Sequence, residues 1–179
     1  MVLLFALSWG FIIMDRSTIL YLGPMIMEIF NINYAQVSTI TMVQSFGFAA
    51  MSIIMAFISD KTGYKKRWLI PFTLLAAVFS GITAFAPSLA FVLFARLLTG
   101  AAEGPNLPLM SAMVAYQGNP KRYAQNIGFI QLGTSILGGV LAPVVITQLA
   151  VKVSWQAAFL LTALPAFIVG VLIWKLTKE

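Results

Sequence analysis

Long runs of apolar residues recur along this chain and constrain what it can fold into. The main runs are 1–13, 37–58, 68–95, 127–149 and 157–174. About 20 apolar residues cross the hydrocarbon core of a bilayer as an α-helix. Because 60% of the residues are hydrophobic and only 9% are charged, a water-soluble globule is excluded. Alternation with a period of two is absent, which argues against a membrane β-barrel.

The sequence predicts an all-α membrane protein with six transmembrane helices in one bundle joined by short loops. The expected spans are 2–30, 36–58, 68–86, 89–117, 123–150 and 154–175. An even number of crossings returns the chain to its starting side, so both termini should lie on the same side of the membrane.

The basic residues gather in a few short segments. Eight of the eleven are Lys61, Lys65, Lys66, Arg67, Lys121, Arg122, Lys175 and Lys178. The loops expected on the other side hold only Lys152. This pattern is typical of cytoplasmic loops in polytopic proteins. We therefore expect an inner (cell) membrane protein with cytoplasmic N- and C-termini, whose charge reflects the lipid bilayer and not nucleic acid.

Several kinds of chemistry are excluded by composition. The chain has no cysteine and no histidine, so disulfides and thiolate metal sites are excluded and any proton chemistry must use carboxylates. No nucleophile–base pair, metal-ligand cluster or phosphate-binding loop is visible, which argues against an enzyme. We expect no cofactor and no metal site.

Four charged residues lie inside the predicted spans: Asp15, Arg16, Arg96 and Glu103. A charge at the bilayer centre costs about 2.5–3.5 kcal/mol on insertion scales, so these side chains should face a wet cavity or each other. Arg96 and Glu103 are seven residues apart and share one helix face, about 10 Å apart along the axis. Gly100 between them leaves room for a ligand or a neighbouring backbone. Asp15 and Arg16 point about 100° apart.

Two interpretations of these charges remain open. In one, two ion pairs, Asp15 with one arginine and Glu103 with the other, hold the first and fourth spans together. In the other, the arginines bind an anionic substrate, since a guanidinium grips a carboxylate with two N–H groups, and the carboxylates carry protons. Substrate competing for an arginine would release a carboxylate to take a proton, which couples the two. Glu28, near the end of the first span, is expected to be solvated.

Glycine is frequent in the fifth predicted span, at Gly128, Gly133, Gly138 and Gly139. Small residues allow helix backbones to approach closely in membranes. Close helix packing is the simplest explanation for these four glycines.

The loop from Ser59 to Arg67 resembles the loop between helices two and three of the major facilitator superfamily. The family pattern is Gly-x-x-x-Asp-Arg-x-Gly-Arg-Lys/Arg; here Ala56, Lys61 and Tyr64 depart from it. The resemblance implies a gating loop on the cytoplasmic face, with Asp60 as the gating residue. Its residues are Asp60, Gly63, Lys65, Lys66 and Arg67.

A second resemblance narrows the family. The segment Arg96–Pro108 resembles the helix-four pattern Arg-x-x-x-Gly-x-x-Glu-Gly-x-x-x-Pro of the anion:cation symporters, and Asp15–Ser17 resembles their helix-one Asp-Arg-Ser. Trp155–Phe159 resembles the start of their helix six. The resemblance implies symport of a small organic anion, such as a sugar acid, with protons or in some members sodium. It implies that Asp15 and Glu103 are linked to protons, while Arg16 and Arg96 hold or sense the anion.

Several positions depart from the sugar-acid members. Ile12 and Ile13 stand where many have Asn and Tyr, and Phe48 stands where a Tyr is common. Thr134 takes the place of a glutamine nine residues before Pro143, with Gln131 one turn earlier; the resemblance makes both substrate-binding candidates. Because hydroxyl-binding groups are lost while the charges are retained, we expect an anion with fewer hydroxyls than an aldonate or hexuronate.

The resemblance also implies that six helices are the N-terminal half of a twelve-helix fold, with the C-terminal half absent from this sequence. A fragment, a truncated gene and a functional half that dimerises all remain open. Alternatives to anion symport are another major facilitator transporter, carrying a drug, neutral sugar or peptide, and a non-transporting membrane sensor or assembly subunit.

Overall fold

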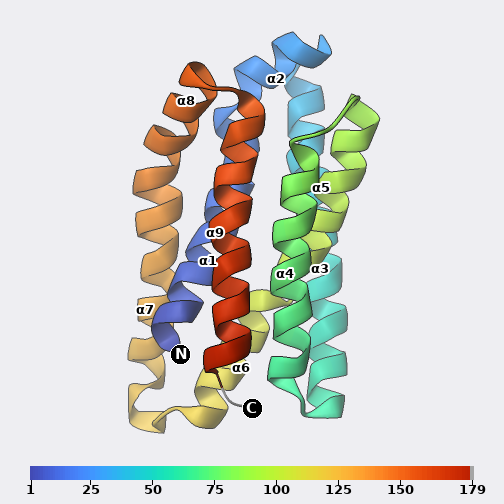
Figure 1. The fold of residues 1–179 in the computed structure, drawn as a ribbon. Helices are drawn as coiled ribbons and strands as arrows, with labels where there is room; N and C mark the ends of the chain where they lie inside the picture. Colours follow the sequence, from blue (N-terminus) through green and yellow to red (C-terminus); the bar gives the residue numbers. More distant parts are fainter. Residues whose placement is uncertain (178–179) are drawn as a thin grey trace.

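The computed structural model describes residues 1–177, which form a bundle of long helices running roughly along one axis (Figure 1). The described residues contain no strand, and the predicted all-α class is confirmed. The helical elements, in chain order, are α1 (Val2–Tyr21), α2 (Gly23–Phe30), α3 (Tyr34–Thr62), α4 (Lys65–Thr83), α5 (Leu89–Glu103), α6 (Asn106–Gln117), η1 (Pro120–Arg122), α7 (Tyr123–Gly133), η2 (Thr134–Leu141), α8 (Ala142–Lys152) and α9 (Trp155–Leu176).

Four helical stretches in residues 1–177 are long and apolar enough to cross a membrane. They are Val2–Tyr21, Tyr34–Thr62, Pro120–Lys152 and Trp155–Leu176. The third of these joins η1, α7, the π-helical η2 and α8 without a break. The third predicted span corresponds to α4, which begins with three basic residues. The fourth predicted span corresponds to α5 and α6, which are separated by Gly104 and Pro105.

The predicted first span, 2–30, is two helices. α1 ends at Tyr21, and α2 begins at Gly23 with Pro24 in its first turn. Proline lacks the N–H that would continue the hydrogen-bond ladder of the preceding helix, which explains a new start there. Figure 1 shows α2 at one end of the bundle, leaning away from α1.

Short polar residues set several helix ends. Asn33 and Gln36 form a reciprocal capping box at the start of α3, which satisfies two backbone N–H groups. Ser88 and Ser154 cap α5 and α9 by accepting hydrogen bonds from backbone N–H groups three residues later. Gly63 ends α3 with φ = 76°, a left-handed conformation that glycine adopts without a steric penalty.

The interior contains two apolar clusters. One includes Trp155 and Phe159, and the other includes Phe5 and Leu69. Along α1, the cluster with Phe5 includes buried residues up to Ile12, and the cluster with Trp155 includes buried residues from Met14 onward. The charged residues therefore lie where two apolar cores meet.

Several glycines let helices touch backbone to backbone, and the closest approaches are at Gly100, Gly104 and Gly133. A Cβ at Gly100 would lie 2.0 Å from the carbonyl oxygen of Gln44, and one at Gly104 would lie 2.2 Å from that of Phe48, so α5 packs directly on α3. A Cβ at Gly133 would lie 1.9 Å from the carbonyl oxygen of Ala6, which brings α7 equally close to α1.

The packing expected of the glycines in the fifth predicted span holds for some of them. Gly133 and Gly138 face α1 at distances that exclude a Cβ, whereas a Cβ at Gly128 would meet nothing within 4 Å. Packing on neighbouring helices therefore explains Gly133 and Gly138 and does not explain Gly128.

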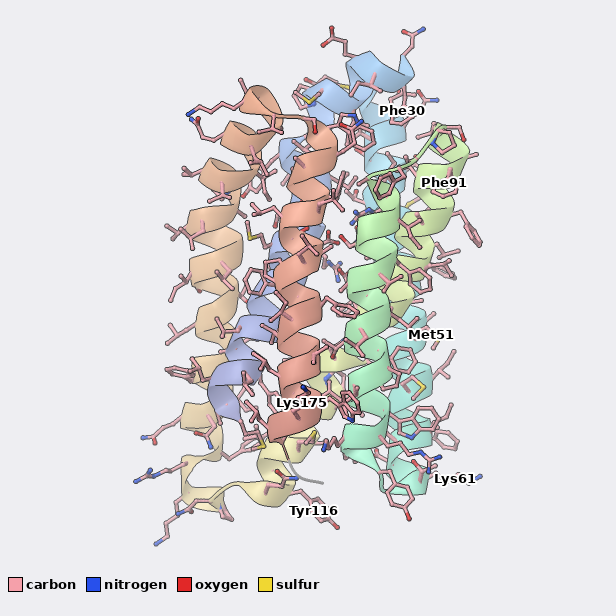
Figure 2. All side chains as sticks on the ribbon, in the orientation of Figure 1. Phe30, Met51, Lys61, Phe91, Tyr116 and Lys175 are labelled. Carbon is pink, nitrogen blue, oxygen red and sulfur yellow. The ribbon has the colours of Figure 1, made fainter. Side chains whose placement is uncertain are left out.

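The surface has the distribution of side chains expected for a bilayer. Large apolar side chains such as Ile53, Phe57 and Leu164 are exposed around the bundle. Figure 2 shows Lys61 and Lys175 at one end, with Phe30 and Phe91 toward the other. Lys178, the last residue of the predicted basic segments, lies outside the described residues.

We predict that Gly100→Ala destabilises the bundle, because the added Cβ overlaps the α3 backbone. Overpacking of this kind costs about 1–3 kcal/mol, measurable as a lower midpoint of thermal unfolding by circular dichroism in detergent. Gly128→Ala is the matched control and should leave the midpoint unchanged or raise it. Equal midpoints for Gly100→Ala and the parent chain would contradict the close contact.

Candidate functional site

Asp15 on α1 is the centre of a buried polar cluster. Its Oδ2 accepts a hydrogen bond of 2.7 Å from Arg96 Nη1 on α5. Its Oδ1 accepts from Ser80 Oγ on α4 and, at 3.2 Å, from Thr162 Oγ1 on α9. One carboxylate therefore joins four helices, and it is only 5% exposed.

Arg96 is completely buried, with 0% exposure. Its guanidinium carbon lies 4.5 Å from the ring centroid of Phe159 on α9, close enough for a cation–π interaction. Among the described residues its Nε and Nη2 have no hydrogen-bond partner. Arg96 therefore contacts one carboxylate and one aromatic ring, while two of its buried nitrogen atoms lack a hydrogen-bond acceptor among the described residues.

Glu103, at the end of α5, is also buried and accepts a 3.1 Å hydrogen bond from Gln44 Nε2 on α3. The seven-residue spacing predicts that Arg96 and Glu103 lie on the same face of one helix. In the structure both side chains are buried in the bundle. The space beside Gly100 is filled by the backbone of Gln44 and not by a ligand. Of the two ion pairs considered from sequence, the structure contains Asp15–Arg96; the partner of Glu103 is an amide.

A small cavity lies between the two carboxylates. Asp15 and Glu103 line it together with the hydroxyl-bearing residues Ser8, Thr73 and Ser80. The space open to the centre of a water molecule is about 10 Å³, close to the minimum that one water needs. The two proton-linked candidates thus line the same small cavity.

Arg16 differs from the other three charged residues because it is half-buried and not enclosed. Its Nη2 donates a 3.2 Å hydrogen bond to Ser45 Oγ, and its guanidinium carbon lies 4.4 Å from the ring centroid of Phe48. The other N–H groups of Arg16 have no partner in the described part of the chain. Arg16 is therefore the arginine that a ligand can reach in this conformation.

The two polar candidates of the fifth predicted span lie together. Gln131 Oε1 accepts hydrogen bonds from Thr134 Oγ1 at 3.2 Å and from Trp9 Nε1 on α1 at 2.9 Å. Trp9 in turn packs on Phe48, with ring centroids 6.5 Å apart. A row of contacts therefore connects Gln131, through two aromatic rings, with Arg16.

The predicted gating loop joins α3 to α4 and is not part of the buried cluster. Asp60 forms an ion pair with Lys65, which also donates a 3.3 Å hydrogen bond to Ser59 Oγ. Lys66 and Arg67 have no ion-pair partner among residues 1–177. Within the same residues no group of three or more potential metal ligands occurs.

Sequence reasoning missed several members of the site, among them Gln44, Ser80, Thr162 and Trp9. Gln44 could have been found, since a glutamine within an apolar span is costly and needs a partner. Serine and threonine carry no such signal, because their hydroxyls can bond the carbonyl four residues earlier in a helix. Trp9 resembles any other apolar residue in the sequence.

Comparisons with known proteins agree on one family. The family model of the Major Facilitator Superfamily matches residues 5–179, and this chain belongs to that family. The predicted resemblance to these transporters, and the expectation that the chain is not an enzyme, are thereby confirmed.

Individual relatives narrow the comparison. The chain is 30% identical over 93% of its length to a hexuronate transporter of Bacillus subtilis (strain 168), and covers 39% of that protein. It is 31% identical over 87% of its length to a hexuronate transporter of Escherichia coli (strain K12), and covers 35% of it. The chain thus spans less than half the length of the curated relatives that it matches.

A solved structure supports the fold. The chain superimposes, with a TM-score of 0.89 and 20% identity, on a bacterial homologue of the human lysosomal transporter Spinster in an inward-facing and occupied conformation. The match covers 99% of this chain and 44% of the other. The chain is therefore a multi-pass membrane protein with the major facilitator fold.

We predict that Asp15→Asn and Arg96→Met each destabilise the bundle strongly, since each leaves an unpaired partner in the interior. Removing one partner of a buried ion pair costs about 3–5 kcal/mol, measurable by thermal unfolding in detergent. The double variant should recover much of the loss, and Arg16→Gln, at a half-buried position, should cost far less. Single variants as stable as the parent chain would show that the pair does not support the fold.

Proposed function

We propose that this chain is the N-terminal half of a symporter that moves a small organic anion together with protons by alternating access. The observation that carries the proposal is the division of the charges: Asp15, Arg96 and Glu103 are buried together, while Arg16 is open to a ligand. The hexuronate transporters among the relatives support an organic anion, such as a sugar acid or another carboxylate, as the substrate.

In this proposal Arg16 binds the carboxylate of the substrate. A planar guanidinium with free N–H groups forms two parallel hydrogen bonds to a carboxylate. Gln131 and Thr134 complete the site in this half. Arg96 senses the anion without touching it in this conformation, because it is completely buried and paired with Asp15.

Protons are carried by Asp15 and Glu103. The partner of Glu103 is the neutral amide of Gln44, so protonation of Glu103 breaks no ion pair in this conformation. Glu103 also lines the same small cavity as Asp15, the partner of Arg96. A change in the charge of Glu103 therefore changes the stability of the Asp15–Arg96 ion pair and the binding of the anion to Arg16. The movement of protons and the movement of the anion are coupled in this way.

The membrane arrangement follows the same proposal. Six crossings, formed by α1–α2, α3, α4, α5–α6, α7–α8 and α9, place both termini and the basic loops in the cytoplasm of a cell with the chain in its cell membrane. Asp60, Gly63, Lys65, Lys66 and Arg67 form the cytoplasmic gating loop. A second six-helix half, which Arg16 faces across the substrate, completes the transporter.

We predict that Glu103→Gln abolishes proton-driven accumulation of the anion in proteoliposomes of the full-length transporter but spares counterflow exchange. Glutamine keeps the shape of the side chain and cannot take up or release a proton. Glu28→Gln, at an exposed carboxylate, is the matched control and should change neither activity. Loss of both activities together in Glu103→Gln would assign Glu103 a structural role.

We also predict that the same gene, or the gene directly after it, encodes a second six-helix half of the transporter. Reading the DNA downstream of the Glu179 codon in all frames should reveal six further apolar spans. If none is found, the proposed pairing with a C-terminal half is wrong, and cross-linking should then be used to test for a dimer of this chain.

A further inference from the structure

The surface beside Arg16 is aromatic. Phe48 lies under the guanidinium and contacts Trp9, whose own N–H is taken up by Gln131. Trp9 is only 5% exposed, so its indole packs on Phe48 inside the bundle, and the half-buried Phe48 is the ring that a ligand can reach. Ile13, one turn before Arg16 on α1, is half-buried and also offers no polar group.

Among the described residues in this strip of contacts from Arg16 to Gln131, the free polar groups lie at the two ends. Arg16 and Ser45 form one end, and the amide of Gln131 with the hydroxyl of Thr134 forms the other. Arg16 and Trp9 are seven residues apart on α1, so the ends are about 10 Å apart along the helix axis. A ligand held by Arg16 and extending toward Gln131 therefore passes the ring of Phe48.

A polyhydroxylated acid fits this strip poorly. It would place hydroxyl groups over Phe48, and a hydroxyl that leaves water without gaining a partner costs free energy. An aromatic ring gains from the same surface, because offset and tilted ring pairs are favourable beyond the area that they bury. A carboxylate conjugated to a ring is also flat, like the guanidinium that grips it.

We infer that the substrate class of this site is an aromatic carboxylate: a single ring whose carboxylate binds Arg16, whose faces contact Phe48, and whose polar ring atom or substituent reaches Gln131. The inference rests on the proposed function and concerns the part of the site built by this half. It assigns Phe48 to specificity and Gln131 to the recognition of the far end of the ring.

Competitive uptake by the full-length transporter in proteoliposomes tests the inference. The probes are benzoate and nicotinate as aromatic carboxylates, cyclohexanecarboxylate as a non-aromatic acid of the same size, and galacturonate as a polyhydroxylated acid. The two aromatic acids should compete best, and galacturonate should compete about tenfold more weakly. Equal competition by benzoate and cyclohexanecarboxylate would show that size alone matters and would overturn the role of the ring.

Variants of α3 sharpen the test. Phe48→Leu removes the aromatic face while retaining apolar bulk and should weaken benzoate uptake about tenfold, with little change for cyclohexanecarboxylate. Phe46→Leu is the matched control, because Phe46 is 70% exposed on the same helix. Phe48→Tyr, which adds a hydroxyl, should improve competition by galacturonate.

The outcomes separate the two proposals. Preferred uptake of galacturonate, unchanged in Phe48→Leu, would overturn the aromatic substrate class and leave proton-coupled anion transport intact. Absence of uptake for every anion would overturn the proposed function itself. Equal thermal midpoints for the Phe48→Leu and Phe46→Leu proteins would show that a change in uptake is not caused by unfolding.

Discussion

The ion pair between Asp15 and Arg96 is the interaction on which the interior depends. Two charges removed from water cost more than their attraction returns unless further hydrogen bonds complete the geometry. Here Ser80 and Thr162 supply those bonds to Asp15, and the ring of Phe159 covers the guanidinium. These contacts come from α4 and α9, so the same pair that carries charge in the apolar bundle also fixes the positions of four helices.

Close helix packing makes this arrangement specific. The backbone of Gln44 lies against Gly100, which sets the depth at which the Gln44 side chain meets Glu103. On the other side of α1, contact between Gly133 and Ala6 brings α7 close enough for Gln131 to accept the N–H of Trp9. Glycines thus position both the buried carboxylate and the polar end of the open face, although none of them contacts a ligand.

Burial separates the four membrane charges into two roles. Asp15, Arg96 and Glu103 are enclosed within this chain, whereas Arg16 is half-buried and keeps free donors. In the proposed mechanism a ligand on Arg16 acts on the enclosed charges through electrostatic interaction and not through contact. Such coupling needs short distances in a medium of low dielectric constant, and the packed interior provides both.

The amino-acid sequence by itself determined the helical membrane class, the family and the identities of the charged residues, because long apolar runs, basic loops and costly intramembrane charges are visible without a structure. The resemblance in residues 59–67 and 96–108 was sufficient to name the superfamily that the comparisons then confirmed. The pairing of the charges could not be read in this way, since Asp15 and Arg96 are 81 positions apart and either arginine was a reasonable partner. The tertiary structure decided the pairing, because α4, α5 and α9 meet at Asp15 and bury it with Arg96, while Arg16, the next residue on α1, is only half-buried.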